Sequence, residues 1–155
     1  REEHKNLISL LSSFIETAST NESLFNKSKD LILKILDSKT RDEIVNTVEA
    51  CFVKEFKVDK CCMKFFKGKQ LDDIENTIGL SLHKGAIHCG SLSAEKTETL
   101  FNDHEIESMV IAVLVLKNEI CLLMLGSFER TKYLGDEDTT FIEYIRDVLE
   151  KKLTQ

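Results

Sequence analysis

Three side chains that could bind a metal ion or react with a substrate lie within seven residues: His83, His88 and Cys89. Imidazole and thiolate groups are zinc ligands, but structural zinc sites normally have paired ligands, and this group lacks a fourth member. The chain contains no C-x-x-C sequence, and the adjacent Cys61 and Cys62 are poorly placed to chelate one ion. The pattern favours partly exposed histidines above a packed thiol, so no metal site is predicted.

Cys89 is the one cysteine that lies outside an apolar run, and Gly90 follows it. Such a thiol becomes reactive if a nearby cation lowers its pKa, and His88 is its neighbour in sequence. The alternative is that Gly90 serves a tight turn while Cys89 packs as a small hydrophobic side chain. We favour packing, predict no catalytic residue, and expect a non-enzymatic protein. A thiol-based redox sensor or enzyme that uses Cys89 is the alternative function.

Two hydrolase motifs begin in the chain and are not completed. His104 and Glu105 start the metalloprotease helix motif, but Ser108 stands where its second histidine is required. Ser91 is not a nucleophile elbow, because that motif needs glycine two residues away on each side. The sequence therefore supports neither of these hydrolase classes.

The overall charge is acidic, with a formal net charge of -6 and a pI near 5.3. Six lysines between Lys54 and Lys69 alternate with phenylalanines, but binding of nucleic acid generally needs a basic domain, so they indicate a solvated edge strand. The longest apolar run, Met109 to Leu116, is far shorter than the roughly 20 residues that span a membrane. The five cysteines are odd in number, which favours a reducing compartment. We therefore predict a cytoplasmic protein that binds neither nucleic acid nor membranes.

The elements that position these side chains are organised around the stretch from Ser108 to Ser127. Its two apolar runs flank Lys117, Asn118 and Glu119, which predicts two antiparallel strands joined by a tight turn. Nearly every strand position is apolar, so both faces of the sheet must be covered. Helices are expected on one face, and a ligand, a partner subunit or long loops on the other.

Hydrophobic spacing predicts the remaining elements in order. The expected elements are a long helix from Arg1 to Asp37, a helix from Arg41 to about Phe56 with a capping box at Thr40 and Glu43, strands at Asp59 to Phe66 and Thr77 to Leu82, a short helix from Ala94 to Phe101, the hairpin, and a last helix bearing Phe141 to Leu153. The polar run from Thr17 to Glu22 is either a polar layer in one long helix or the start of a second helix, and we favour one helix. This order predicts an α+β fold in which helices pack on one face of an antiparallel sheet.

Four segments in this order resemble a known family. They are A-S-T-N-E-S-L-F-N-K from Ala18, F-K-V-D from Phe56, C-G-S-L from Cys89 and L-L-M-L-G-S from Leu122. The chain resembles a bacterial family with a GAF-like fold, the domain of unknown function 484, and from Leu24 onward it looks like a GAF domain. GAF domains sense small molecules and dimerise, so the resemblance implies a sensory or scaffolding role in signalling. Two departures from the family pattern are Ser91, where a basic residue is common, and the lack of proline after Ser127.

We divide the chain into an N-terminal helical extension, residues 1–22, and a GAF-like domain, residues 23–155. The apolar stripe of the first helix begins well before the domain can cover it, and exposed apolar patches usually mark an interface. A homodimer is therefore predicted, and Asn21 could fix its register as a polar seam residue. The expected interface residues are Leu7, Leu10, Leu11, Phe14, Ala18 and Asn21.

A small-molecule pocket is predicted over the sheet face opposite the helices. The expected lining is Met63 and Phe65 from the first strand, Cys89 and Gly90 from the crossing segment, and Met109 and Ile111 from the hairpin. The sequence identifies no ligand or cofactor. The alternative is a purely structural dimer in which the protein's own Met and Phe side chains fill this space.

Overall fold

The structure, a computed structural model, describes residues 22–133 and 139–155. Its centre is the predicted hairpin, formed by β3 (Ser108–Val115) and β4 (Ile120–Ser127). The four-stranded antiparallel sheet has the order β1-β4-β3-β2, with β1 (Lys60–Phe66) and β2 (Ile87–Gly90) at its edges. Every residue of β4 is buried, as two covered faces require. The predicted hairpin and its central position are confirmed.

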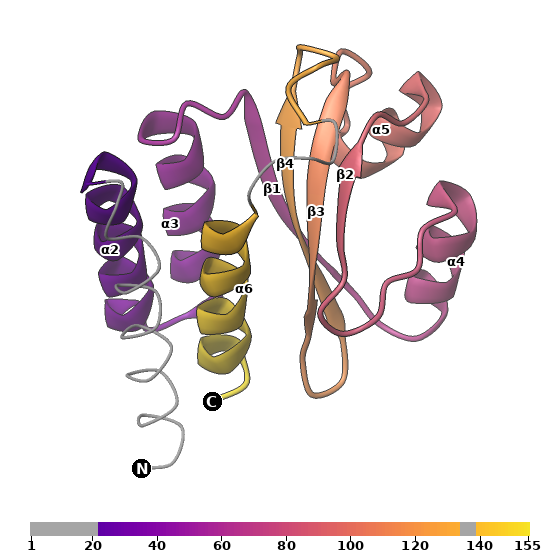
Figure 1. Cartoon of the computed structure of the whole chain (residues 1–155). Coiled ribbons are helices and arrows are strands. Elements are labelled where there is room, and N and C mark those ends of the chain that lie inside the picture. The colour runs from indigo at the N-terminus through magenta and orange to yellow at the C-terminus, as the bar shows by residue number, and fades with distance from the viewer. Residues whose placement is uncertain (1–21, 134–138) are drawn as a thin grey trace.

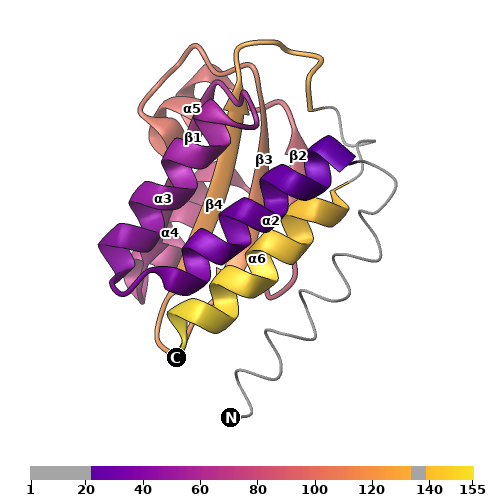
Figure 2. The same cartoon turned by 90° about the vertical axis from the view of Figure 1, so that its left-hand side faces the viewer.

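Three helices cover one face of the sheet: α2 (Glu22–Asp37), α3 (Arg41–Lys54) and α6 (Thr140–Leu153), as Figure 1 shows. The predicted capping box is present, because Thr40 accepts a hydrogen bond from the Glu43 N–H and the Glu43 carboxylate accepts one from the Thr40 N–H. The α2 and α6 helices lie side by side (Figure 2), and Lys152 donates to the carbonyl of Leu36 at 3.0 Å. We call the buried side chains between these helices and the sheet the three-helix core.

Two short helices, α4 (Lys69–Ile78) and α5 (Ala94–Phe101), lie on the other side of the sheet (Figure 1). The α+β class is confirmed, but helices rather than irregular segments cover this second face. The α5 helix was expected, and Ser93 caps it by accepting from the Lys96 N–H. The buried side chains under α4 and α5 form a separate cluster, which we call the second-face core.

The predicted strand from Thr77 to Leu82 is wrong, and the sequence analysis did not predict the α4 helix. The apolar residues of α4, Leu71, Ile74 and Ile78, recur at helical spacing, and Ile74 and Ile78 are buried in the second-face core. Gly79 then ends the helix in a left-handed conformation with φ 72°, which glycine adopts without a steric penalty.

The fourth strand of the sheet is β2, in a region where the sequence pattern loosens. All four of its residues are only half-buried, so they show no alternation of apolar and polar positions. Pairing with β3 defines the strand, with Ile87 opposite Ala112 and Gly90 opposite Met109. Because pairing with β3 defines this strand, its own residues give little indication of a strand in the sequence.

The first predicted helix falls partly outside the described residues. Residues 22–37 are helical, as expected. The favoured continuation toward Arg1 and all six predicted interface residues, Leu7, Leu10, Leu11, Phe14, Ala18 and Asn21, lie outside the described range. The homodimer therefore stays a prediction.

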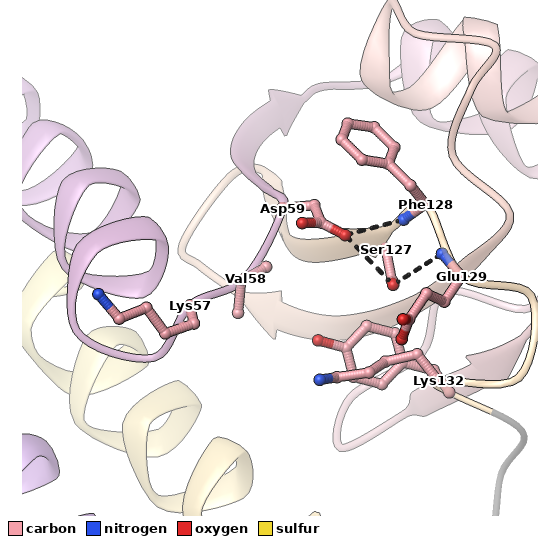
Figure 3. Close-up of a pocket in the computed structure, with 8 residues that line it drawn as sticks. Lys57, Val58, Asp59, Ser127, Phe128, Glu129 and Lys132 are labelled. Carbon is pink, nitrogen blue, oxygen red and sulfur yellow. Dashed lines mark hydrogen bonds between the residues drawn. The ribbon is translucent and has the colours of Figure 1, made fainter.

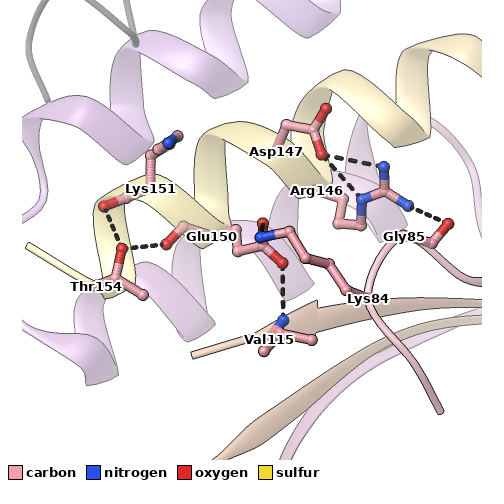
Figure 4. A network of polar contacts seen from close by, with 8 residues as sticks. All are labelled: Lys84, Gly85, Val115, Arg146, Asp147, Glu150, Lys151 and Thr154. Carbon is pink, nitrogen blue, oxygen red and sulfur yellow. Dashed lines mark hydrogen bonds and ion pairs between the residues drawn. The ribbon is translucent and has the colours of Figure 1, made fainter. Parts of the chain in front are cut away.

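The C-terminal helix holds the segment that leads into β2 (Figure 4). Arg146, which is 7% exposed, donates to the carbonyl of Gly85 at 3.1 Å and pairs with Asp147. One turn later, Glu150 accepts a hydrogen bond from the Val115 N–H at 2.7 Å. That N–H lies beyond the paired part of the β3 edge, so the glutamate satisfies a donor that β2 does not reach.

A second helix carboxylate meets the opposite edge of the sheet. Glu49 of α3 accepts a hydrogen bond from the Met63 N–H of β1 at 3.0 Å. In the antiparallel register, Met63 stands between residues whose N–H groups bond to β4, and its own N–H points outward. Glutamates from the three-helix layer therefore cap outward donors at both sides of the sheet.

Candidate ligand-binding site

A pocket of about 460 Å³, which we call the edge pocket, lies along β2. This volume is within the range of roughly 300–1,000 Å³ typical of small-molecule sites. Its lining residues come from the segment after α4, from β2, from the turn that follows β2, from β3 and from the start of α6: Leu80, Ile87, His88, Cys89, Ser91, Leu92, Met109 and Thr139.

The side chains that line the edge pocket are apolar, sulfur-containing or neutral hydrogen-bonding groups. Among the residues that the structure describes there, no lysine, arginine, aspartate or glutamate contributes to the wall. Such a lining removes water from a bound ligand but provides no opposite charge for a charged group on it. Burial of a charged group without a partner is costly in free energy. The site is suited to an uncharged molecule with a few hydrogen-bonding groups.

One histidine of this pocket has a fixed hydrogen-bonding role. The His88 Nε2 atom lies 2.7 Å from the carbonyl oxygen of Ser81. A carbonyl oxygen only accepts hydrogen bonds, so Nε2 is the donor in this contact. The Ser81 hydroxyl in turn lies 3.0 Å from Nδ1 of His83. Ser81 therefore contacts both histidines that the sequence suggested as possible metal ligands, His88 through its carbonyl oxygen and His83 through its hydroxyl.

The structure brings together three of the six predicted ligand-binding residues. Cys89 and Met109 both line the edge pocket, and Gly90 is paired with Met109 across the β2–β3 ladder. Ile111 is fully buried in the second-face core and does not line the pocket.

The other two predicted residues lie at the opposite edge of the sheet. Met63 and Phe65 belong to β1, which β4 and β3 separate from β2. Both pack with the three-helix core rather than on the face opposite those helices. The Arg41 guanidinium lies 4.1 Å from the ring centroid of Phe65, a cation–π contact at the start of α3. The expectation that Met63 and Phe65 line a pocket over the face opposite these helices is therefore wrong.

A second pocket, of about 410 Å³, lies at the end of the sheet where β1 begins and β4 ends. We call it the end pocket (Figure 3). Asp59 Oδ2 accepts hydrogen bonds from the Phe128 N–H at 2.9 Å and the Ser127 hydroxyl at 3.3 Å. The Ser127 oxygen accepts from the Glu129 N–H at 3.0 Å. These bonds fix the start of the loop after β4 against the entry to β1.

The comparison with family models covers the whole chain. Residues 1–155 match the model described as "Protein of unknown function, DUF484". The chain belongs to this family. No curated protein sequence matches the chain significantly. Within residues 22–133 and 139–155, no helix has the length and apolarity needed to cross a membrane.

Three of the four sequence segments that resemble DUF484 contribute residues to the two pockets. F-K-V-D supplies Asp59 and L-L-M-L-G-S supplies Ser127, and these two side chains are hydrogen-bonded in the end pocket. C-G-S-L, residues 89–92, contributes Cys89, Ser91 and Leu92 to the edge pocket. The sequence analysis identified these segments but not their contacts. It missed Ile87, which belongs to β2 itself, and Leu80 and Thr139, which only the tertiary fold brings to β2.

Four of the five free thiols in this DUF484 chain are held in their neutral form. Burial raises the pKa of Cys61 and Cys121 well above the usual range for a thiol, and it raises the pKa of Cys51 and Cys62 as well. A raised pKa lowers the thiolate fraction and with it the reactivity. In the described part of the chain, no three His, Cys, Asp or Glu residues are placed to hold a metal ion.

Proposed function

We propose that this chain is a non-enzymatic, GAF-like sensory module that binds a small uncharged molecule in the edge pocket. The observation that carries the proposal is that Cys89 and Met109, two residues selected from sequence as ligand-binding, line one pocket of suitable volume, and that Gly90, a third, pairs with Met109 beside it. The lack of charged groups in its described lining argues against nucleotides and other phosphorylated ligands. The proposed site lies at the sheet edge rather than over the centre of a face, because the second-face core fills that space.

The proposed sensor is a homodimer held by the N-terminal extension, residues 1–22. The supporting argument is the apolar stripe Leu7, Leu10, Leu11 and Phe14, which lies too far along a helix for the domain to cover both ends. In this proposal, ligand binding in the edge pocket changes the free energy of dimerisation, which is a coupling free energy between two sites.

Light scattering of the full chain and of a chain that starts at Asn21 tests the dimer. The full chain is expected to have twice the mass of one 17.7 kDa protomer, and the shortened chain the mass of a monomer. A monomeric full chain, or a shortened chain that dimerises equally well, would contradict the proposed interface.

Filling the edge pocket tests the ligand site. In a thermal-shift screen of nucleobases, nucleosides, nucleotides and amino acids, we expect an uncharged compound to raise the unfolding midpoint, since a ligand at a hundred times its Kd adds about 2.7 kcal/mol. Ser91→Phe places a ring in the pocket and should abolish the shift. Asn76→Phe adds the same bulk on the exposed face of α4 and should leave the shift unchanged.

A screen without any stabilising compound would support one of the alternatives. If no compound stabilises the full chain, a purely structural dimer without a ligand is favoured. The thiol-based alternative has one supporting observation, because Cys89 lines the edge pocket. Mass-mapped labelling with iodoacetamide near neutral pH separates it from the sensor. If Cys89 reacts no faster than Cys51 or Cys121, the thiol-based function is excluded.

A further inference from the structure

The wall of the edge pocket that β2 forms is weakly held by the strand itself. The strand has four residues, all half-buried, and in the part of the chain that the structure describes β3 is its only neighbour in the sheet. Short segments with few buried apolar contacts belong to the parts of a protein that open most easily. Three of the four residues, Ile87, His88 and Cys89, line the pocket. The shape of the pocket therefore depends on what holds the chain just before β2.

A tight turn, residues 83–86, leads into β2. The N–H of Ala86 donates to the carbonyl of His83 at 3.1 Å, and the carbonyl of Ala86 accepts from the Val113 N–H of β3 at 3.0 Å. Gly85, the third residue of the turn, has φ 81°. A positive φ at this position defines one class of β-turn and suits glycine, which adopts it without a steric penalty. Figure 4 shows that the carbonyl of Gly85 points toward α6.

Arg146 of α6 donates a hydrogen bond to this carbonyl from Nη1. The other side of its guanidinium contacts Asp147, whose Oδ1 atom lies 3.0 Å from both Nε and Nη2. Burial of an arginine is costly unless its donors have partners, and the Arg146 side chain is only 9% exposed. Because the guanidinium is planar and rigid, Asp147 fixes the direction in which Nη1 points. The buried charge therefore ties the turn before β2 to α6.

The same helix also contributes to the pocket wall. Thr139, the residue just before α6, lines the edge pocket. One turn after Arg146, Glu150 lies 3.5 Å from the Lys84 ammonium and accepts a hydrogen bond from the Val115 N–H. The Lys84 side chain is exposed, so this ion pair contributes little. The α6 helix therefore starts at one wall of the pocket and, mainly through Arg146, holds the segment that leads into the other.

We propose that Arg146 is a positioning residue for the edge pocket, although its side chain is not part of the pocket wall. Its bond to the Gly85 carbonyl holds β2 at the distance from α6 that a bound molecule requires. This inference rests on the proposed function, because it assigns the buried arginine a role in ligand binding. Without the bond, the turn and β2 separate from α6 more often. Loss of a hydrogen bond to a charged group is sufficient to shift such an equilibrium by about tenfold.

Amide hydrogen exchange, followed by NMR on the full chain without a ligand, tests whether Arg146 holds β2. The antiparallel alternation that begins with the bond between Ala86 and Val113 directs the N–H groups of His88 and Gly90 toward β3. In Arg146→Met, which keeps an apolar stem but has no donor, these two amides should exchange about tenfold faster than in the native chain.

Two controls separate this local effect from a loss of global stability. The amides of Leu123 and Leu125, which bond to β3 at the centre of the sheet, should keep their native exchange rates in Arg146→Met. Lys151→Met makes the same kind of change elsewhere on α6 and should leave every rate unchanged. The proposal is overturned if the β2 amides exchange no faster in Arg146→Met, or if the amides of β2 and β4 accelerate equally.

Calorimetry tests the link to binding. A nucleobase or nucleoside that stabilises the native chain should bind Arg146→Met about tenfold more weakly and Lys151→Met with native affinity. Arg146→Lys, whose ammonium can still donate to Gly85, should lie between the native chain and Arg146→Met. Native affinity in Arg146→Met, or an Arg146→Lys protein as weak as Arg146→Met, would overturn the proposal. If no such compound binds the native chain, the proposed function fails, while exchange in β2 still decides whether Arg146 holds this wall.

Discussion

Raising the pH from 8 to 10 is expected to lower the free energy of unfolding by about 4 kcal/mol more in the native chain than in Cys61→Ala/Cys121→Ala. Burial is the main cause, because it raises the pKa of both thiols in the folded state. Near Cys61 the negative charge of Glu49 adds to this effect, whereas near Cys121 the positive charge of Arg41 opposes it.

The sign follows from which state loses its protons first. The unfolded thiols ionise near pH 8.5, while the folded thiols stay protonated to a much higher pH. Above pH 8.5 the folded state therefore binds more protons than the unfolded state, and stability falls by about 1.4 kcal/mol per pH unit for each thiol. The stability contributed by the neutral thiols is complete below pH 8.5 and is lost as pH rises toward their folded pKa.

Urea unfolding at pH 8, 9 and 10 with a reductant present measures this difference. Lysines and tyrosines also titrate toward pH 10, but they are present in both proteins and cancel in the comparison. The alanine variant is expected to be less stable at pH 8 because it leaves small cavities, so only the pH dependence is compared. Equal pH dependence in the two proteins would contradict the prediction.

Replacing Gly126 by alanine is expected to lower the free energy of unfolding by about 1–3 kcal/mol. An ideal Cβ at this position would lie 2.8 Å from Ile106 Cδ1 and 3.1 Å from Phe101 Cε1, both closer than ordinary contacts. The φ angle of Gly126 is not positive, so the effect arises from packing against the second-face core and not from backbone strain.

The sign of the change distinguishes packing from chain entropy. Where an alanine fits, Gly→Ala stabilises by about 0.4–1 kcal/mol because it restricts the unfolded chain. Ile106→Val removes the closest atom, so the double variant should lose less stability than the sum of the two single variants. Chemical unfolding of the four proteins in this cycle measures the coupling. A Gly126→Ala protein as stable as the native chain would show that the space over β4 is open.

Elements that begin or end at a residue with a clear local preference, such as a helix cap or a turn, could be predicted from the sequence. The capping box at Thr40, the Ser93 cap and the apolar hairpin are all in place. The α4 helix was missed because its three apolar residues are separated by charged ones, and Gly68 just before it suggested a turn. The β2 strand could not be predicted, because only its pairing with β3 defines it.

The lining of the edge pocket could be predicted only in part, for a related reason. Alternation along a strand correctly places Met63 and Phe65 on the same face, and both pack with the three-helix core. It does not give the strand order, so it could not show that β1 and β2 are at opposite edges. Cys89, Gly90 and Met109 converge because β2 pairs with β3, a contact between residues about twenty positions apart.

The two glutamates that cap the strand edges limit how this domain can assemble. A foreign strand that added to β1 would have to displace Glu49 from the Met63 N–H, and one that extended the β3 edge would have to displace Glu150 from Val115. Each displacement leaves a carboxylate without its hydrogen-bond donor. Edge-to-edge joining of sheets into fibres is therefore disfavoured at these two positions. Crowding many copies of this domain together should therefore favour contacts between helices over continuous β-structure.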